Sequence, residues 1–360
     1  MPTTYAIPDG RTAFAATLWT GNSTTGRAIT GVGFAPDFAW IKNRSVGYSN
    51  NLTDTVRGAT KLLFSNNTDP EATTPIHGYI GAFTSDGYTL TNGSSTNGYV
   101  NDSGSNYVGW NWKAGGTAVT NNTGTIQSSV SANTTAGFSV VTYTGIGGNV
   151  SKTFGHGCQV NGTPTAPSMV IVKGRDTGST GVNDWVVWHS AFTGSEYIYL
   201  DLTNAKATSA NYWGATVPSS TVVTVGGNSS NISNESGIKY VAYCFAAVAG
   251  YSAFGSYTGN GDPNGPFVYL GFRPRFVMLK RTDPTGGAWT MVDSSRNPYN
   301  VEDNQLYANY AYTEAGASNT IDALSNGFKL RELGSAINAS GGTYIYMAFA
   351  EVPFKFANAR

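Results

Sequence analysis

Charged side chains are scarce in this chain. They make up 12% of its 360 residues, about half the share found in ordinary soluble proteins. The 21 basic and 21 acidic side chains cancel, so no overall field attracts the protein to phosphate backbones or anionic lipid. Long apolar runs are missing too, because none approaches the roughly 20 residues that cross a bilayer. We therefore expect neither nucleic acid nor a membrane as a partner.

Cysteine is nearly absent. Cys158 and Cys244 are the only two cysteines, too few for a disulfide scaffold, and we interpret them as free thiols in a reducing compartment. Residues 1–5 lack the basic and apolar regions of a signal peptide. We expect synthesis in a cytosol without a leader.

Glycine and aromatic residues are abundant instead. The chain has 45 Gly, 8 Trp, 21 Tyr and 17 Phe, which describes a turn-rich protein that can still bury sizeable cores. Disorder throughout is excluded. The length exceeds that of a usual single domain of about 100–200 residues, so two or three domains are expected.

A repeat of roughly ninety residues runs through the chain. Each copy opens with an aromatic-Thr-Gly turn, continues with a proline, an apolar run and a lysine, and closes with an aromatic strand. The turns begin at Trp19, Tyr143 and Tyr257, the lysines are Lys42, Lys173 and Lys280, and the closing strands begin at Tyr107, Tyr240 and Tyr344.

The first and third copies also share an Asp-x-x-Arg motif. It comprises Asp54 and Arg57 in the first copy and Asp293 and Arg296 in the third, whereas the second copy has His189 nearby. We interpret these motifs as ion pairs at the edge of a sandwich. The three lysines are interpreted as charges that end a strand and blunt its edge.

Short apolar runs bounded by Gly, Asn, Asp, Ser or Pro predict β-strands within each copy. The predicted fold is all-β, with three related antiparallel β-sandwich modules, jelly-roll-like, in tandem. The predicted domains are residues 1–112 with an N-terminal arm, 113–137 as a Gly/Thr/Asn-rich linker or hairpin, 138–249, and 250–360 with a C-terminal tail. Exchange of strands between neighbouring copies stays open.

These blocks, with the opening residues 9–13 and the closing residues 349–354, resemble an uncharacterised family of virion structural proteins of tailed bacteriophages, mostly from marine and freshwater genomes and often labelled tail-fibre-like. The resemblance covers nearly the whole chain. It implies a component exposed on the particle and built from β-sandwich modules. Together with the repeat, the missing catalytic motifs and the missing leader, we expect a non-enzymatic structural protein of the virion that is made in the host cytoplasm. A tail-associated fibre or receptor-binding role comes first, and a head (capsid) decoration protein is the alternative.

Common catalytic signatures are absent from the sequence, and we expect no enzyme activity, no cofactor and no metal. The three histidines, His77, His156 and His189, are far apart in sequence. His156 beside Cys158 could hold a metal or activate a thiol, but a glycine-rich loop explains the pair. Residues 101–106 and 260–264 place oxygen side chains at calcium-like spacing, yet turn chemistry explains both segments.

Aromatic residues on loops are the candidate ligand contacts, because their rings can stack on sugars. They are Tyr48, Tyr99, Trp213, Tyr299 and Tyr310. They favour an alternative function as a glycan-binding adhesin that meets host surface polysaccharide. A polysaccharide-degrading spike is a further alternative, for which Asp54, Asp293, Glu196 and Glu302 are candidate carboxylates.

Self-association is the last expectation. Low charge leaves little repulsion between copies, and oligomers close by point-group symmetry, so we expect a homo-oligomer, with a trimer first, that contacts other virion proteins. Phe354 and Phe356 follow the last strand with no further repeat to pack against. We expect them to dock on another copy or on the particle.

Overall fold

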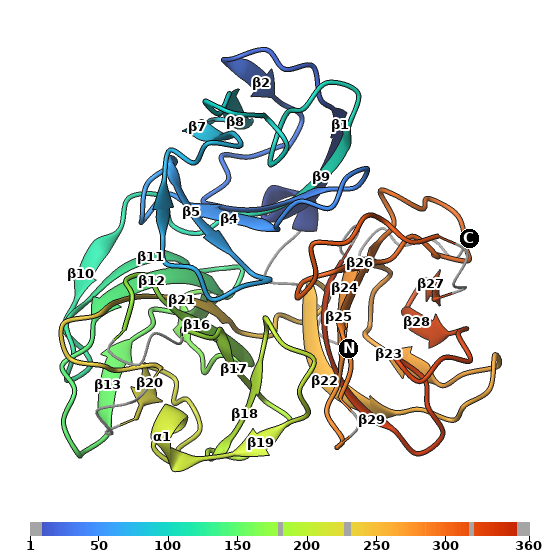
Figure 1. The fold of residues 1–360 in the computed structure, drawn as a ribbon. Coiled ribbons are helices and arrows are strands. Elements are labelled where there is room, and N and C mark those ends of the chain that lie inside the picture. Colours follow the sequence, from blue (N-terminus) through green and yellow to red (C-terminus); the bar gives the residue numbers. More distant parts are fainter. Residues whose placement is uncertain (1–8, 179–182, 227–231, 285, 317–319, 351–360) are drawn as a thin grey trace.

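The structure is a computed structural model that describes residues 9–178, 183–226, 232–284, 286–316 and 320–350. Its fold is all-β, with 43% strand and 2% helix, and the named ladders are antiparallel, which confirms the predicted fold class. Three modules lie around a common centre in Figure 1, with the first (blue) at the top, the second (green to yellow) at lower left and the third (orange to red) at right.

The first module has a six-stranded sheet and a three-stranded sheet, preceded by the 3-10 turn η1 (Gly10–Thr12). The large sheet has the order β1 (Phe14–Thr20), β9 (Asn106–Trp112), β3 (Phe38–Asn43), β4 (Asn51–Asp54), β5 (Lys61–Phe64) and β6 (Ala72–Thr73). The small sheet has the order β2 (Arg27–Ile29), β8 (Gly87–Thr91) and β7 (Tyr79–Thr84).

The third module repeats this plan with a five-stranded and a three-stranded sheet. The large sheet has the order β22 (Ser252–Thr258), β29 (Thr343–Ala350), β24 (Pro274–Arg281), β25 (Trp289–Asp293) and β26 (Leu306–Tyr307). The small sheet has the order β23 (Phe267–Tyr269), β28 (Gly327–Leu330) and β27 (Ile321–Leu324).

The second module has the same central strands with additions at both edges. Its eight-stranded sheet has the order β10 (Val119–Asn121), β11 (Ser128–Asn133), β12 (Phe138–Thr144), β21 (Lys239–Phe245), β16 (Met169–Gly174), β17 (Val186–His189), β18 (Glu196–Tyr199) and β19 (Ala207–Thr208). The small ladders are β13 (Lys152–Gly155) with β20 (Val222–Val225), and β14 (Gln159–Val160) with β15 (Thr163–Pro164). The one described α-helix is α1 (Ala210–Trp213). Residues 113–137 thus contribute two strands to this sheet.

The repeated motifs pair the first strand of each module with its last. The aromatic residue of each aromatic-Thr-Gly turn stacks on the first tyrosine of the closing strand, at centroid distances of 4.9–5.4 Å for Trp19 and Tyr107, Tyr143 and Tyr240, and Tyr257 and Tyr344. The glycine that follows is needed for close approach, since a Cβ on Gly21 would lie 2.0 Å from the Asp102 carbonyl oxygen. The motif is therefore the closing contact of each sheet.

A buried asparagine completes this contact in every module. Asn101, Asn234 and Asn338, each 0% exposed, accept a hydrogen bond from the backbone N–H just after the glycine, at 3.0–3.1 Å. Removing such a buried acceptor leaves a donor unsatisfied, which costs about 1–3 kcal/mol.

The largest core lies where the three big sheets meet, and all three modules contribute to it. Phe14 stacks on Phe349 with centroids 5.1 Å apart, which joins the first module to the third. Phe38 stacks on Tyr243 at 4.3 Å, which joins the first to the second, and Phe245 lies 6.0 Å from Phe349. Truncating one of these rings to alanine lowers the free energy of unfolding by about 3–5 kcal/mol, so the modules stabilise one another.

Candidate functional site

Two of the residues predicted to contact a ligand, Tyr48 and Tyr99, touch each other on the loops of the first module. Their rings are edge to face with centroids 5.8 Å apart, and both rings also contact His77. A third predicted residue, Tyr310 of the third module, stacks on Tyr312 with centroids 4.5 Å apart and planes 19° from parallel. Tyr312 is 59% exposed, so this stacked pair is open to solvent.

Lys42 brings the two tyrosine pairs to the same place. Its Nζ donates to the carbonyl oxygen of Tyr48 at 2.6 Å and to that of Ala311 at 3.0 Å. We call Tyr48, Tyr99, Tyr310 and Tyr312 the tyrosine ledge. Tyr312 was not among the predicted ligand contacts, although the dense spacing of Tyr307, Tyr310 and Tyr312 could have indicated it.

The other predicted contact residues lie elsewhere. Trp213 belongs to α1 and is 1% exposed, so it packs in the core of the second module and is not available to a ligand. The prediction that it lies on a loop surface was wrong, because the short helix turns its ring inward. Tyr299 is 82% exposed, and within the described residues no ring contact joins it to the ledge. Phe354 and Phe356 lie outside the described residues.

Each module contacts the next in the same way, so the three close a ring from head to tail. We name the contact of the first and second modules seam A, that of the second and third seam B, and that of the third and first seam C. At every seam the lysine of the repeat donates to a backbone carbonyl of the neighbouring module at 3.0 Å: Lys173 to Thr68 in seam A, Lys280 to Thr203 in seam B and Lys42 to Ala311 in seam C.

The lysines are at most 1% exposed, so the prediction that they blunt a strand edge was wrong. Their strands β3, β16 and β24 lie inside the large sheets, and a loop of the neighbouring module covers each ammonium group. Burial lowers the pKa of Lys42 and of Lys280 to about 7. It lowers the pKa of Lys173 to about 8, where Asp201 and Asp184 oppose the shift.

A second donor crosses each seam from equivalent positions: Trp185 and Asn50 directly precede β17 and β4, and Trp289 is the first residue of β25. The indole N–H of Trp185 donates to the Phe64 carbonyl at 2.9 Å in seam A, that of Trp289 to the Tyr199 carbonyl at 2.8 Å in seam B, and the amide of Asn50 to the Tyr307 carbonyl at 2.9 Å in seam C. The same geometry at three seams indicates that the repeat encodes the ring as well as the module.

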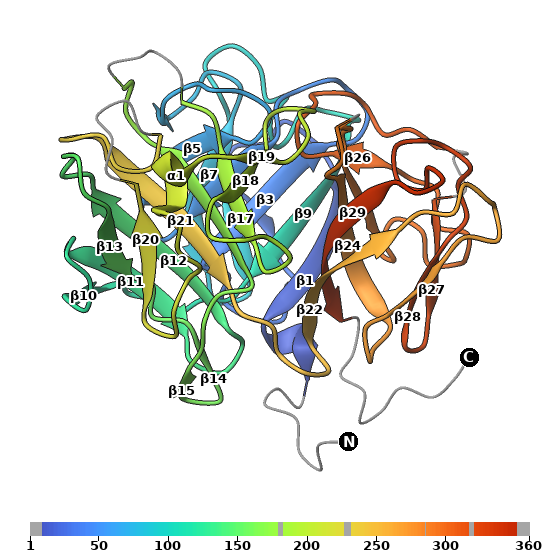
Figure 2. The same cartoon turned by 90° about the horizontal axis from the view of Figure 1, so that it is seen from below.

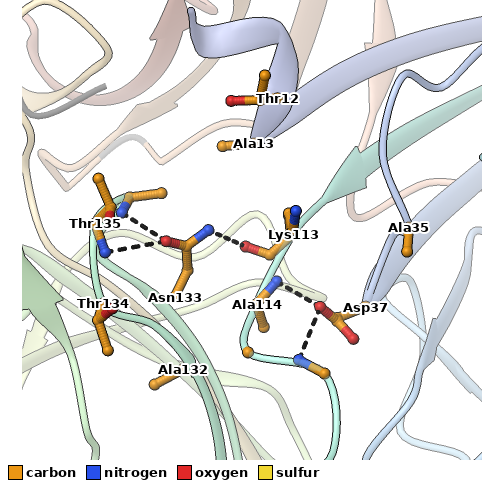
Figure 3. Close-up of a pocket in the computed structure, with 13 residues that line it drawn as sticks. Thr12, Ala13, Ala35, Asp37, Lys113, Ala114, Ala132, Asn133, Thr134 and Thr135 are labelled. Atoms are coloured by element: carbon orange, nitrogen blue, oxygen red, sulfur yellow. Dashed lines mark hydrogen bonds between the residues drawn. The ribbon is translucent and has the colours of Figure 1, made fainter. Parts of the chain in front are cut away.

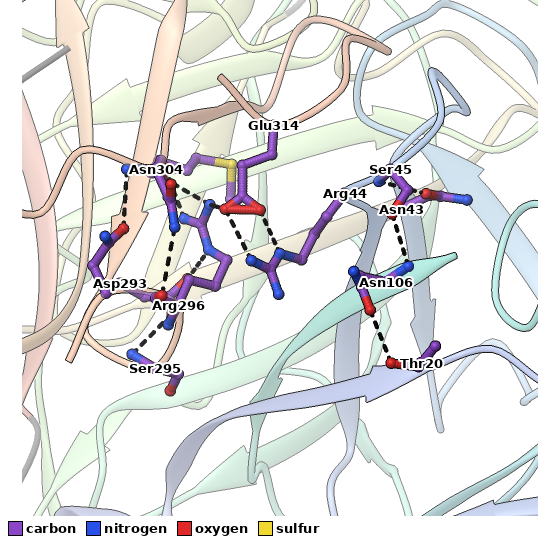
Figure 4. Close-up of polar contacts among 12 residues, drawn as sticks. Thr20, Asn43, Arg44, Ser45, Asn106, Asp293, Ser295, Arg296, Asn304 and Glu314 are labelled. Carbon is purple, nitrogen blue, oxygen red and sulfur yellow. Dashed lines mark hydrogen bonds and ion pairs between the residues drawn. The ribbon is translucent and has the colours of Figure 1, made fainter. Parts of the chain in front are cut away.

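Seam C also contains a relay of charges, shown in Figure 4. Arg44 of the first module is paired with Glu314 of the third, and Glu314 lies 3.3 Å from Arg296. Arg296 is paired with Asp293 at 2.6 Å, and Asp293 accepts from the indole N–H of Trp110 across the seam at 3.0 Å. Every charge of the relay has an opposite neighbour, as buried charges require.

Seam A has the same relay in the same order. Arg175 is paired with Glu71 at 2.8 Å, Glu71 with Arg57 at 3.1 Å, and Arg57 with Asp54 at 2.5 Å. Asp54 accepts across the seam from the Tyr243 hydroxyl at 2.9 Å. The predicted Asp-x-x-Arg ion pairs are therefore confirmed, but their side chains are fully buried at seams and not at a sandwich edge.

Seam B replaces the relay with different chemistry. His189 stands where the other modules have aspartate, since it lies opposite Met169 as Asp54 lies opposite Phe38 and Asp293 opposite Phe276. Its Nε2 donates to the Tyr346 carbonyl at 3.1 Å. Phe192 takes the place of the arginine, and Lys206 lies 5.4 Å from its ring centre and pairs with Glu196. Burial lowers the pKa of His189 to about 4, so the seam holds a neutral imidazole.

A cavity of about 620 Å³ opens beside seam A at the end where the described chain begins, shown in Figure 3. Asp37 accepts from the backbone N–H of Ala114 at 2.8 Å and of Gly116 at 3.3 Å, and Asn133 donates to the Lys113 carbonyl at 3.2 Å. Burial raises the pKa of Asp37. These bonds join the segment after β9 to the residue before β3 and to the end of β11, so the polar groups of the cavity stabilise its own walls.

The remaining candidates serve local structure. In the segment proposed as a calcium-like loop, Asn260 accepts from the Asp262 N–H at 3.0 Å and Asp262 from the Asn264 N–H at 2.7 Å, as in a turn. Nδ1 of His156 accepts from the backbone N–H of Cys158 at 3.0 Å. Across the described ranges, no three His, Cys, Asp or Glu side chains are placed to hold a metal, and no helix is long and apolar enough to span a membrane.

Comparison with known proteins gives one match. A family model described as a domain of unknown function (DUF7483) matches residues 9–353, nearly the whole chain and all three modules. No curated protein and no solved structure matches the chain.

Proposed function

We propose that this chain, which belongs to the DUF7483 family, is a non-enzymatic structural protein exposed on the virion of a tailed bacteriophage, with a tail-associated fibre or receptor-binding role first. The resemblance of its repeat motifs to virion proteins motivates the proposal. One observation carries it: the residues that recur between modules, Lys42, Lys173 and Lys280 above all, hold a closed ring together. Function on a shared fold has to be argued from its sites. Here the recurring residues make structural contacts between modules, and this supports a scaffold.

The two ends of the ring suit attachment and display. Ala350 at the end of β29 pairs with Pro274, and Arg275 lines a cavity together with Asp9 and Arg11, so the described chain begins and ends on one face. In Figure 2, β1 starts and β29 ends toward the lower side. Tyr48 follows the opposite end of β3, so the tyrosine ledge lies on the other face. We propose that the first face meets the particle and the ledge face points outward.

The test is the composition of purified virions. Mass spectrometry of washed particles should detect the protein at a fixed copy number, and its absence would end the proposal. Labelled antibodies against the intact protein, seen by electron microscopy, then separate the tail position from the alternative of a head decoration protein.

A glycan-binding adhesin is the second candidate, and the open Tyr310 and Tyr312 pair favours it. Saturable binding of the isolated protein to extracted host polysaccharide is expected, and Tyr312→Ala should weaken it roughly two- to tenfold, since an aromatic contact contributes about 0.5–1.5 kcal/mol. Tyr269→Ala is the matched control, because Tyr269 is 66% exposed on β23 of the third module. Equal effects of both changes would remove the ledge from consideration. A reducing-end assay on the same polysaccharide tests the degrading-spike alternative.

Self-association into a homo-oligomer, with a trimer as the first state to test, remains part of the proposal. The three seams are filled within one chain, so contacts between chains must use other surfaces. Light scattering at particle-like concentration measures the state, and a monomer there would contradict self-association of the free protein.

A further inference from the structure

The two cysteines, which lie 86 residues apart in sequence, meet in the second module. Ser139 on β12 and Cys244 on β21 are partners in the antiparallel register, so their side chains leave the same face of the sheet. Cys158 comes from the loop before β14, and its Sγ lies 3.2 Å from Ser139 Oγ and 3.5 Å from the Cys244 carbonyl oxygen. Both cysteines are free thiols in the structure.

The surroundings prepare one sulfur for nucleophilic attack. Burial disfavours the thiolate at Cys158, but the neighbouring Cys244 thiol opposes this effect of burial, and the pKa of Cys158 is lowered. Burial raises the pKa of Cys244. The attacking species in thiol–disulfide exchange is a thiolate. The lowered pKa favours Cys158 for the first attack, and Cys244 is the second thiol.

We propose that Cys158 and Cys244 are a disulfide-forming pair that closes by exchange with a low-molecular-weight disulfide, such as oxidised glutathione. The Cys158 thiolate attacks one sulfur of that disulfide, forms a mixed disulfide and releases the first small thiolate. Cys244 then loses its proton to solvent or to that thiolate, attacks Cys158 Sγ and releases the second. Two protein thiols are oxidised to one disulfide, and one small disulfide is reduced to two thiols.

The hairpin beside Cys158 gives the reagent its route. Both cysteines are at most 1% exposed, so reaction requires local opening. The ladder of β14 and β15 has only two residue pairs, Gln159 with Pro164 and Val160 with Thr163, and such short peripheral elements open far more often than the whole domain. The closed bond would tie the base of this hairpin to β21, a central strand that also contributes Tyr243 to seam A.

The consequence goes beyond the proposed function and does not depend on it. A protein made in a reducing cytosol would fold with two thiols and gain the cross-link after release into oxidising surroundings. Because the bond closes a long loop in the unfolded chain, we expect the oxidised protein to melt at a higher temperature than the reduced protein.

The test uses the full reduced chain. It is incubated with oxidised glutathione, quenched with acid, unfolded in guanidinium with N-ethylmaleimide and weighed by intact mass spectrometry. The expected product takes up no maleimide, retains no glutathione and runs as a monomer on a non-reducing gel. Retention of both maleimide labels, after an incubation that oxidises the guanidinium-unfolded chain, would overturn the proposal. So would disulfide-linked dimers or glutathione on both cysteines.

Two single variants test the order of attack. Cys244→Ser should stop at the mixed disulfide and carry one glutathione on Cys158. In Cys158→Ser, the remaining Cys244 should keep its maleimide label over the same time, because its thiol lacks a lowered pKa. Faster glutathionylation of Cys158→Ser than of Cys244→Ser would contradict the assigned nucleophile. The wild-type result decides the pair itself, even where a variant folds poorly.

Discussion

Replacing Asp201 with asparagine should stabilise the protein at neutral pH. Asp201 is 6% exposed, and its Oδ1 accepts from the backbone N–H of Trp185 at 3.0 Å. The equivalent side chains are amides in the other modules, where Asn66 accepts from the Asn50 N–H and Asn309 from the Trp289 N–H, both at 2.8 Å. The repeat itself thus uses asparagine at this position in two of three modules.

The size of the effect follows from the protonation of the carboxyl group. Burial, together with the neighbouring Asp184, raises the pKa of Asp201 to about 8, against about 3.9 in an unfolded chain. Below about pH 4 the folded and the unfolded chain both hold the proton, and Asp201 does not lower the free energy of unfolding. As the pH rises to about 7, the unfolded chain loses the proton and the folded chain keeps it. At 1.36 kcal/mol per pH unit, this lowers the free energy of unfolding by on the order of 3–4 kcal/mol.

Urea denaturation of wild type and Asp201→Asn at about pH 4 and about pH 7 measures the difference. The variant should be more stable by about 3 kcal/mol near pH 7 and nearly equal near pH 4. The reverse change, Asn309→Asp in the third module, is the matched control and should add a further loss of stability between about pH 4 and about pH 7. If the gap between wild type and Asp201→Asn is the same at both pH values, Asp201 is ionised in the fold and the reasoning fails.

Three further predictions concern the seams, and denaturation curves measure each. Burial lowers the pKa of Lys280 to about 7, so wild-type stability should fall as the pH drops from about 10 to about 7. Lys280→Met should make this fall smaller by the share of Lys280 and leave the shares of Lys42 and Lys173; an unchanged slope would contradict it. Burial lowers the pKa of His189 to about 4, so stability at seam B should fall by up to about 3 kcal/mol as the pH drops from about 6.5 to about 4, and His189→Gln should abolish that loss. Arg296→Met leaves Asp293 buried without its partner and should remove about 3–5 kcal/mol, whereas adding Asp293→Leu should restore most of it; equal losses in the single and double variants would refute the ion-pair account.

The module could be predicted from sequence because its contacts are local to the repeat. The stacking of Trp19 on Tyr107 joins two motifs that recur together. The buried asparagine could have been found in the same way, since Asn101, Asn234 and Asn338 each precede the first tyrosine of the closing strand by six residues. Recurrence at a fixed spacing is the signal that a residue has one structural task in every copy.

The ring could not be predicted, because its contacts join residues that no motif relates. Lys42 ends an apolar run, and such a lysine is typical of a strand edge. Only the fold shows that the loop of Ala311, about 270 residues away in the chain, covers its ammonium group. For the same reason, only part of the tyrosine ledge could be predicted. Tyr48 and Tyr310 come from different modules, and seam C brings them together.

Fusion of three modules in one chain lets the seams differ, which identical subunits cannot do. A ring of head-to-tail contacts closes when each unit offers one face and accepts another, and three separate copies would repeat one seam three times. Here seams A and C keep the arginine–glutamate–arginine–aspartate relay, while seam B has His189, Phe192 and Lys206 in its place. The second module also carries the added strands β10 and β11 and the cysteine pair. The differences are therefore concentrated in the second module and seam B, whereas seams A and C keep the charged contacts that close the ring.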